Sequence, residues 1–172
     1  MDPGDLQATP ALHRLADDHP NESRRAAGRV LRRSRRAYLS PGKTHLVRSS
    51  DDGETWRAPE IIRDSPLDDR DAGIIETARG TLLVSWFSAT SFESNPDYRD
   101  YGATLTAETR EQYLGNWVLR SEDGGRTWGE PIRVNASAPH GPVQLRDGRI
   151  LYLGVGRLDD ERTIVAEEST DD

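Results

Sequence analysis

The sequence contains no cysteine, which excludes disulfide bridges and zinc sites built from thiolates. Only one of its 23 basic residues is a lysine, Lys43, so arginine carries nearly all of the positive charge. Long apolar runs are also missing: no stretch has the length of a membrane-spanning helix, and the amino terminus lacks a signal-peptide core. As written, the sequence predicts a cytoplasmic protein that makes no contact with a membrane.

The charge balance narrows the choice of partners. The net charge of −7 gives no general attraction to nucleic acid, and 34% hydrophobic residues is a low share for a self-sufficient globule. Against this trend, the segment from Arg24 to Arg36 holds seven arginines among thirteen residues. It is either a basic arm for nucleic acid or an acidic glycan, or a strand with an arginine-rich exposed face. We prefer the strand and expect no nucleic-acid partner.

An eight-residue pattern, S-x-D-x-G-x-T-W, occurs twice in the chain. The residues before each copy, Thr44–Arg48 and Asn116–Arg120, alternate between apolar and polar as half-buried strands do. Within the pattern, Ser, Asp and Thr side chains can accept backbone N–H groups, and the glycine suits a positive φ. The tryptophan is expected to begin the return strand and to pin the hairpin on its neighbour. The pattern therefore predicts a tight hairpin turn at each copy, built by Ser49, Asp51, Gly53, Thr55 and Trp56 and by Ser121, Asp123, Gly125, Thr127 and Trp128.

The acidic residues of these turns leave a calcium loop as an alternative interpretation. The ligand spacing of a calcium-binding helix-loop-helix is absent, however, and a turn explains every fixed position of the pattern. We therefore expect neither a metal ion nor another cofactor.

A second repeated element, Gly28–Leu31, is echoed by Gly80–Leu83 and Gly148–Leu151. It lies 21 residues before the first S-x-D-x-G-x-T-W copy, and Gly148 lies 21 residues before Ser169. Ser169 and Asp171 are thus the opening of a third copy. The middle unit is about 20 residues longer, and the extra residues near 94–110 predict an irregular excursion with a short helix at 106–113.

Each unit reads as four short antiparallel strands, which is typical of a β-propeller blade. In the middle unit the strands are Gly73–Thr77, Leu82–Phe87, the strand before the second copy, and Ile132–Val134. The sequence predicts an all-β fold, a partial propeller of about two to three blades. Its predicted divisions are an irregular leader (1–22), a partial blade (23–63), a complete blade (64–135) and an interrupted blade (136–172).

The two copies of S-x-D-x-G-x-T-W resemble the Asp-box, or BNR repeat, of the sialidases (neuraminidases). The resemblance covers most of the chain after Gly28. It implies a six-bladed β-propeller with the Asp-box between the third and fourth strands of a blade, away from the active site. Sialidases remove terminal sialic acid from glycans with an arginine triad, a tyrosine–glutamate pair and an acid–base aspartate, without a cofactor.

Most of these catalytic residues have no counterpart here. For the first family arginine there is only His13–Ala16, which lacks the proline of the family motif, and no acidic residue lies between Arg24 and Arg48. Tyr98, Tyr101 and Tyr113 lie in the excursion. The resemblance therefore implies a fragment, inactive alone, whose exposed blade faces need missing blades or another chain. The alternative is a non-catalytic propeller module that binds carbohydrate or protein.

Ligands of propellers bind where the innermost strands converge. Two such strand entrances are visible, Asp69–Gly73 and Pro139–Pro142, and alignment of the repeats places Ala72 level with His140. We expect Arg70 to pair with a sugar carboxylate, Asp71 to accept sugar hydroxyls and His140 to donate a hydrogen bond or transfer a proton. A solvated acidic turn at 68–71 and a simple turn residue at 140 are the alternatives. Glu76, Trp86 and Phe87 are assigned to packing or strand faces.

Overall fold

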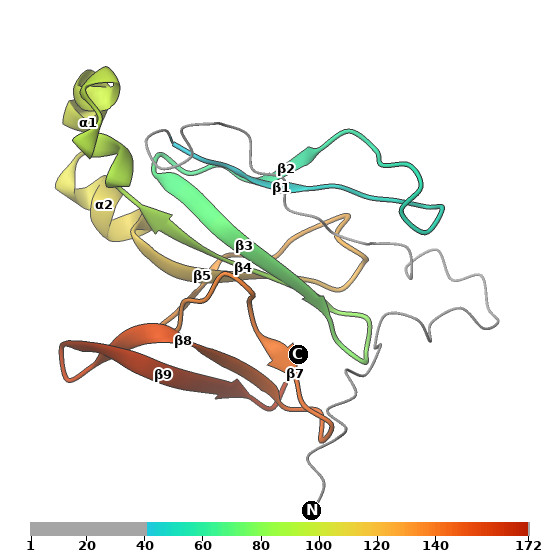
Figure 1. Ribbon diagram of the computed structural model, residues 1–172. Helices are drawn as coiled ribbons and strands as arrows, with labels where there is room; N and C mark the ends of the chain where they lie inside the picture. Colours follow the sequence, from blue (N-terminus) through green and yellow to red (C-terminus); the bar gives the residue numbers. More distant parts are fainter. Residues whose placement is uncertain (1–40, 172) are drawn as a thin grey trace, which may run out of the picture.

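The computed structural model describes residues 41–171, and this part of the chain is predominantly β. It forms three antiparallel sheets that follow one another from top to bottom in Figure 1. The first contains β1 (Thr44–Leu46) and β2 (Glu60–Arg63). The second contains β3 (Asp68–Glu76), β4 (Leu82–Ala89), β5 (Gly115–Ser121) and β6 (Ile132–Val134), and the third β7 (Val143–Gln144), β8 (Ile150–Leu158) and β9 (Glu161–Ser169). The predicted leader and the arginine-rich segment Arg24–Arg36 lie outside the described residues, as do His13–Ala16, Gly28–Leu31 and Asp172.

The connection between β4 and β5 is helical, so the prediction of an irregular excursion is wrong for most of its length. It contains two short 3-10 helices, Ser91–Ser94 and Pro96–Tyr98, followed by α1 (Arg99–Thr104) and α2 (Ala107–Tyr113). The short helix predicted at 106–113 is confirmed as α2, whose first turn is capped by the Thr106 hydroxyl accepting from the Thr109 N–H at 3.1 Å. Both helices lie at one end of the second sheet (Figure 1).

The core lies on the second sheet. Trp86 of β4 and Trp117 of β5 are direct cross-strand partners whose rings are stacked, with centroids 6.4 Å apart. Val84 and Leu119 complete the buried cluster, and Ile62 of β2 packs against it, which joins the first sheet to the second. Full burial of each such side chain stabilises the fold by about 1.5–3 kcal/mol. The packing role expected for Trp86 is confirmed.

The turn that joins the first two strands of a unit is repeated in detail. In the second sheet the Gly80 N–H donates to the Thr77 carbonyl and the Thr77 N–H donates to the Thr81 carbonyl, both at 2.9 Å. Sixty-eight residues later, Gly148, Leu145 and Arg149 form the same two bonds at 3.1 and 2.7 Å. Both glycines have a positive φ (86° and 92°), which explains why the echo in the sequence begins with glycine.

Both copies of S-x-D-x-G-x-T-W form hairpin turns, the first between β1 and β2 and the second between β5 and β6. In the second copy the Asp123 carboxylate accepts the Thr127 N–H at 2.9 Å, the Thr127 hydroxyl at 2.6 Å and the Ser121 hydroxyl at 2.8 Å. The Ser121 hydroxyl in turn accepts the Gly125 N–H at 2.8 Å. The first copy repeats these bonds with Ser49, Asp51, Gly53 and Thr55.

The tryptophans of the pattern do not begin the return strands. Trp56 and Trp128 precede β2 and β6, so that part of the prediction is wrong. The reason is local: the Trp56 ring N–H folds back on its own turn and donates to the Gly53 carbonyl at 3.1 Å. Trp128 packs against the core of the second sheet, as expected for a residue that pins the hairpin.

Arg48, at the end of the first sheet, connects the two hairpins. Its guanidinium donates to the carbonyls of Gly124 and Gly125 at 2.6 and 2.7 Å, inside the second copy of the pattern. The side chain is mostly buried, 16% exposed, so these charge-assisted bonds fix the first sheet against the second.

Acid is expected to weaken these turns. Hydrogen bonds from the Thr55 hydroxyl, the Thr55 N–H and the Ser49 hydroxyl lower the pKa of Asp51 to about 2, and the matching donors from Thr127 and Ser121 lower the pKa of Asp123 further. A carboxylate whose pKa is lower in the folded state stabilises the fold at pH values above its unfolded-state pKa of about 3.9. This stabilisation is lost as the pH falls through the folded-state pKa.

We therefore expect the thermal midpoint to fall as the pH drops from about 4 to about 2, through the protonation of Asp51, and to continue falling below pH 2 as Asp123 is protonated. The double variant Asp51→Asn/Asp123→Asn is expected to have a lower midpoint at pH 6 and a flatter dependence on acid. Thermal unfolding followed by circular dichroism at a series of pH values measures both effects. An unchanged slope in the variant would contradict this assignment of the two carboxylates.

Candidate functional site

Asp71 lies where the pairing of β3 with β4 shifts register, between Arg70 and Gly73. Its φ of 53° is in the left-handed region, which few residues other than glycine adopt. Such strained positions cluster at functional sites. The Asp71 carboxylate has no hydrogen bond or ion pair with any other residue of 41–171, and the residue is half-buried. The ligand role predicted for Asp71 remains a prediction.

The turn that contains His140 packs against this part of β3. A Cβ placed on Gly73 would lie 2.6–2.7 Å from backbone atoms of His140 and Gly141, so only glycine permits the contact. His140 is exposed, and its ring has no partner among the described residues. The His140 turn lies in the segment that connects β6 to β7. It packs against β3 at Gly73, which is two residues along the chain from Asp71.

Beneath the turn lies a further polar group that the sequence did not single out. Ser85 is fully buried on β4, and its hydroxyl has no hydrogen-bond partner in the described part of the chain. The hydroxyl faces Gly141, where an added Cβ would lie 2.8 Å from it. Ser85 is the cross-strand partner of Gly73, so the two strands, the turn and this hydroxyl meet at one point.

The acidic run at the start of β3 is buried, and the alternative of a solvated turn at 68–71 is wrong for Asp68 and Asp69. These side chains are only 1% and 2% exposed because β3 begins at Asp68, ahead of the predicted start at Gly73. Asp69 accepts hydrogen bonds from the Ser65 N–H and hydroxyl at 2.6 and 2.9 Å. It also accepts the Trp86 ring N–H at 3.2 Å and the Ser88 hydroxyl at 2.6 Å.

Arg70 forms an ion pair with Asp68, and both side chains are largely buried, 9% and 2% exposed. Asp68 also accepts the Gly42 N–H at 2.8 Å, which ties the segment before β1 to β3. The guanidinium of Arg70 is thus engaged inside the protein, whereas the side chains of Asp71 and His140 have no partner among residues 41–171. Of the three predicted ligand residues, the structure places Asp71 and His140 in one region and turns Arg70 toward Asp68.

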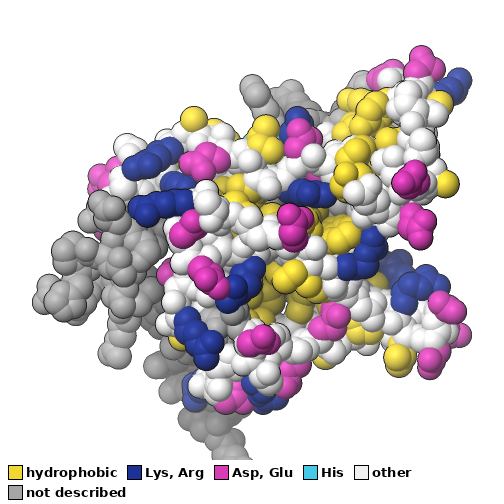
Figure 2. Space-filling view, turned by 180° about the vertical axis from the view of Figure 1, so that it is seen from behind, with side chains coloured by type: hydrophobic (Ala, Val, Ile, Leu, Met, Phe, Trp, Pro, Cys, Tyr) yellow, Lys and Arg dark blue, Asp and Glu magenta, His cyan; other side chains and the backbone are white. Residues whose placement is uncertain are grey.

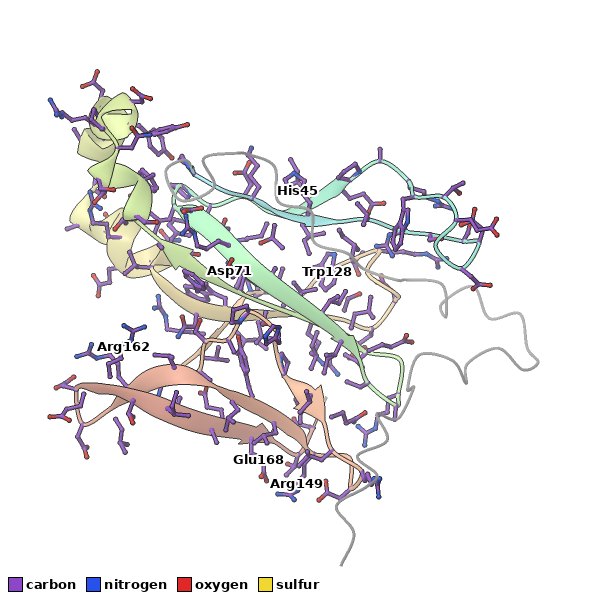
Figure 3. The ribbon with its side chains drawn as sticks, in the orientation of Figure 1. His45, Asp71, Trp128, Arg149, Arg162 and Glu168 are labelled. Carbon is purple, nitrogen blue, oxygen red and sulfur yellow. The ribbon has the colours of Figure 1, made fainter. Side chains whose placement is uncertain are left out.

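The candidate site lies at the end of the second sheet that also carries α1 and α2, and the S-x-D-x-G-x-T-W turns lie at the opposite end (Figure 1). Figure 3 shows the same separation, with Asp71 on β3 and Trp128 toward the other end of the sheet. The arrangement offers a carboxylate and an imidazole as hydrogen-bonding groups and as a proton acceptor and donor.

Two further observations concern metal ions and membranes. Within residues 41–171 no three His, Asp or Glu side chains gather closely enough to hold a metal ion. In the same range, no helix has both the length and the apolar character that a membrane crossing requires.

A scan against protein-family models finds no match to this chain, and a search of curated proteins finds no significant match either.

Proposed function

We propose that this chain is part of a β-propeller of the sialidase type. In this proposal the sheet β3–β6 is one blade, and β1–β2 and β7–β9 belong to the blades on either side. The supporting observation is the position of the repeated turn, which in both copies joins the last two strands of its sheet. The third sheet follows the same plan, since β9 leads into Ser169 and Asp171, whose side chains form the 2.8 Å bond that opens the pattern.

The function we infer is directed at glycans: an exo-α-sialidase-like glycoside hydrolase that acts on terminal sugars. We place in this chain a binding part of the site, formed by Asp71 and His140. A carboxylate without a partner among residues 41–171, on a strained and half-buried residue, is suited to accept hydrogen bonds from sugar hydroxyls. We assign no catalytic role to any residue of this chain.

A second candidate is a non-catalytic module that binds carbohydrate or protein. It is favoured by Arg70, since a guanidinium already paired with the buried Asp68 is not offered to a sugar carboxylate. Turnover of a fluorogenic sialoside by the complete propeller to which we assign this chain supports the hydrolase, and glycan binding without turnover by that propeller supports the binding module. Turnover by this chain alone would contradict our assignment of no catalytic residue to it.

The binding role of Asp71 and His140 can be measured directly. We expect Asp71→Asn and His140→Ala to weaken saccharide binding by about tenfold or more each, as loss of a hydrogen bond to a charged group does. The matched control is Asp100→Asn, which removes an exposed carboxylate of α1. Isothermal titration of a glycan chosen by array screening gives the affinities. Equal affinities for wild type, Asp71→Asn and His140→Ala would overturn the assignment.

A further inference from the structure

A groove of about 520 Å³ lies between the second and third sheets, beside the candidate site. One wall comes from the ends of β4, β5 and β6, and the other from the β8–β9 hairpin. Figure 2 shows basic side chains gathered in the recess between the helical lobe and the lower lobe. The polar lining residues are Asn116, Arg133, Asn135, Ser137, Arg157 and Arg162. Among residues 41–171 no acidic residue lines the groove, although the chain as a whole carries a net charge of −7.

Two of these arginines, Arg157 and Arg162, are direct cross-strand partners on β8 and β9. Like charges directly opposite one another destabilise a sheet, because their side chains share one face at short range. Neither arginine forms an ion pair with another described residue, and the Arg162 side chain has no hydrogen bond there. Within the described part of the chain, the Arg157 guanidinium donates to a single acceptor, the Asp160 carbonyl in the turn at the hairpin tip. In Figure 3, Arg162 lies near that tip.

The third arginine is fixed in place on the opposite wall. Arg133 donates to the Leu114 and Glu111 carbonyls at 2.6 and 2.9 Å, at the end of α2, and its guanidinium lies over the Trp117 ring at 4.3 Å. A guanidinium that binds neutral carbonyls and an aromatic face keeps its full positive charge. The described lining of the groove therefore holds three positive charges and no counter-charge.

The backbone that frames the groove is held by reciprocal bonds. The Asn135 amide donates to the Arg157 carbonyl at 2.8 Å and accepts the Arg157 N–H at 2.9 Å. Asn116 donates to the Asn135 carbonyl at 2.7 Å, and the Glu167 carboxylate accepts the N–H groups of Asn135 and Ala136. The two walls are thus tied together, which preorganises the groove for a ligand.

We propose that this groove, the arginine groove, binds an oxyanion, a carboxylate or sulfate ester, carried by a saccharide unit next to the one at Asp71 and His140. Planar guanidinium groups match such oxyanions, and bound negative charge relieves the repulsion between Arg157 and Arg162. The volume lies within the range of ligand pockets, and Pro139 in the lining is the neighbour of His140, so the groove continues from the candidate site. The saccharide part of this inference rests on the proposed function, whereas the oxyanion part rests on the arginines alone.

The test is titration of the full chain with four probes: inorganic sulfate, a sulfated disaccharide, a uronic-acid disaccharide and a neutral disaccharide. We expect an acidic disaccharide to bind about tenfold more tightly than the neutral one, and the double variant Arg157→Gln/Arg162→Gln to remove that preference. The sulfated and uronic-acid probes identify which oxyanion is preferred. The matched control, Arg146→Gln, neutralises an exposed arginine outside the groove and is expected to keep the preference.

Stability provides an independent readout. Because the like-charge pair is removed, Arg162→Gln is expected to raise the thermal midpoint at low salt by about 1–3 °C. Unchanged affinity for acidic probes in the double variant, or equal weakening by Arg146→Gln, would overturn the inference. If the neutral disaccharide binds and depends on Asp71 while the arginine variants change nothing, the groove inference fails and the proposed function stands. If sulfate binds through Arg162 and no saccharide binds, the proposed function fails.

Discussion

Replacement of Asp69 by alanine is expected to lower the free energy of unfolding by about 3–5 kcal/mol. The carboxylate is 2% exposed and accepts four hydrogen bonds, from Ser65 twice, Trp86 and Ser88. Removal of the acceptor leaves buried donors without partners, and each such group costs about 1–3 kcal/mol. Urea denaturation followed by tryptophan fluorescence measures the loss, because the buried Trp86 reports on the same site.

The matched control is Asp64→Ala. Asp64 also carries a carboxylate close to the start of β3, but it is 46% exposed and pairs with Lys43 at the surface. Surface ion pairs contribute at most about 1 kcal/mol, so the control is expected to stay within that range. A loss of similar size in both variants would show that the buried network at Asp69 does not hold the start of β3.

The regular part of the fold could be predicted from the sequence because the chain repeats itself. Each glycine turn is held by backbone bonds, and each S-x-D-x-G-x-T-W turn by side-chain bonds of its Ser, Asp and Thr, that join residues at most four positions apart, such as Thr127 to Asp123. Local bonds of this kind depend on the residues in the turn and little on the rest of the chain. The strands beside the turns were found for the same reason, with β5 predicted at Asn116–Arg120 and observed at Gly115–Ser121.

The buried start of β3 could not be predicted in the same way. The run Asp68 to Asp71 is as polar as a solvated turn, and nothing local indicates that two of its carboxylates are buried. The partners that make burial favourable are distant in sequence: Trp86 and Ser88 reach Asp69 across 17 and 19 residues. Only the pairing of β3 with β4 brings these donors together.

In the candidate site, the placement of Asp71 and the His140 turn could be predicted from the sequence, whereas the direction of the Arg70 side chain could not. Alignment of the repeats placed Asp71 and His140 at comparable levels, and the structure brings the His140 turn against β3. The same alignment did not distinguish Arg70 from Asp71, because the direction in which each side chain points depends on the register shift between Arg70 and Gly73. The pairing of Arg157 with Arg162, in contrast, can be predicted from the local sequence. These arginines flank Leu158–Glu161, whose central Asp159–Asp160 forms a two-residue hairpin turn.

Replacement of Gly73 by alanine is expected to disrupt the candidate site, because Gly73 is the point at which β3 contacts the His140 turn. The new methyl group would lie 2.6–2.7 Å from the His140 carbonyl group and the Gly141 nitrogen, so the turn must move away from β3. Overpacking against backbone costs about 1–3 kcal/mol. Because the His140 turn moves relative to Asp71, saccharide affinity is expected to fall by about tenfold as well. Urea denaturation and calorimetric titration of the same preparation measure the two effects.

The chain offers a control for the added methyl group itself. An alanine at Gly129 would place its Cβ no closer than 3.6 Å to the Arg120 carbonyl, and this glycine has no positive φ. Gly129→Ala is therefore expected to change stability by less than about 1 kcal/mol, in the stabilising direction if the backbone is compatible, and to leave affinity unchanged. If Gly73→Ala behaves like Gly129→Ala in both measurements, the turn at His140 does not rest on β3. If Gly73→Ala loses stability but keeps its affinity, the contact is real and saccharide binding does not depend on the position of His140.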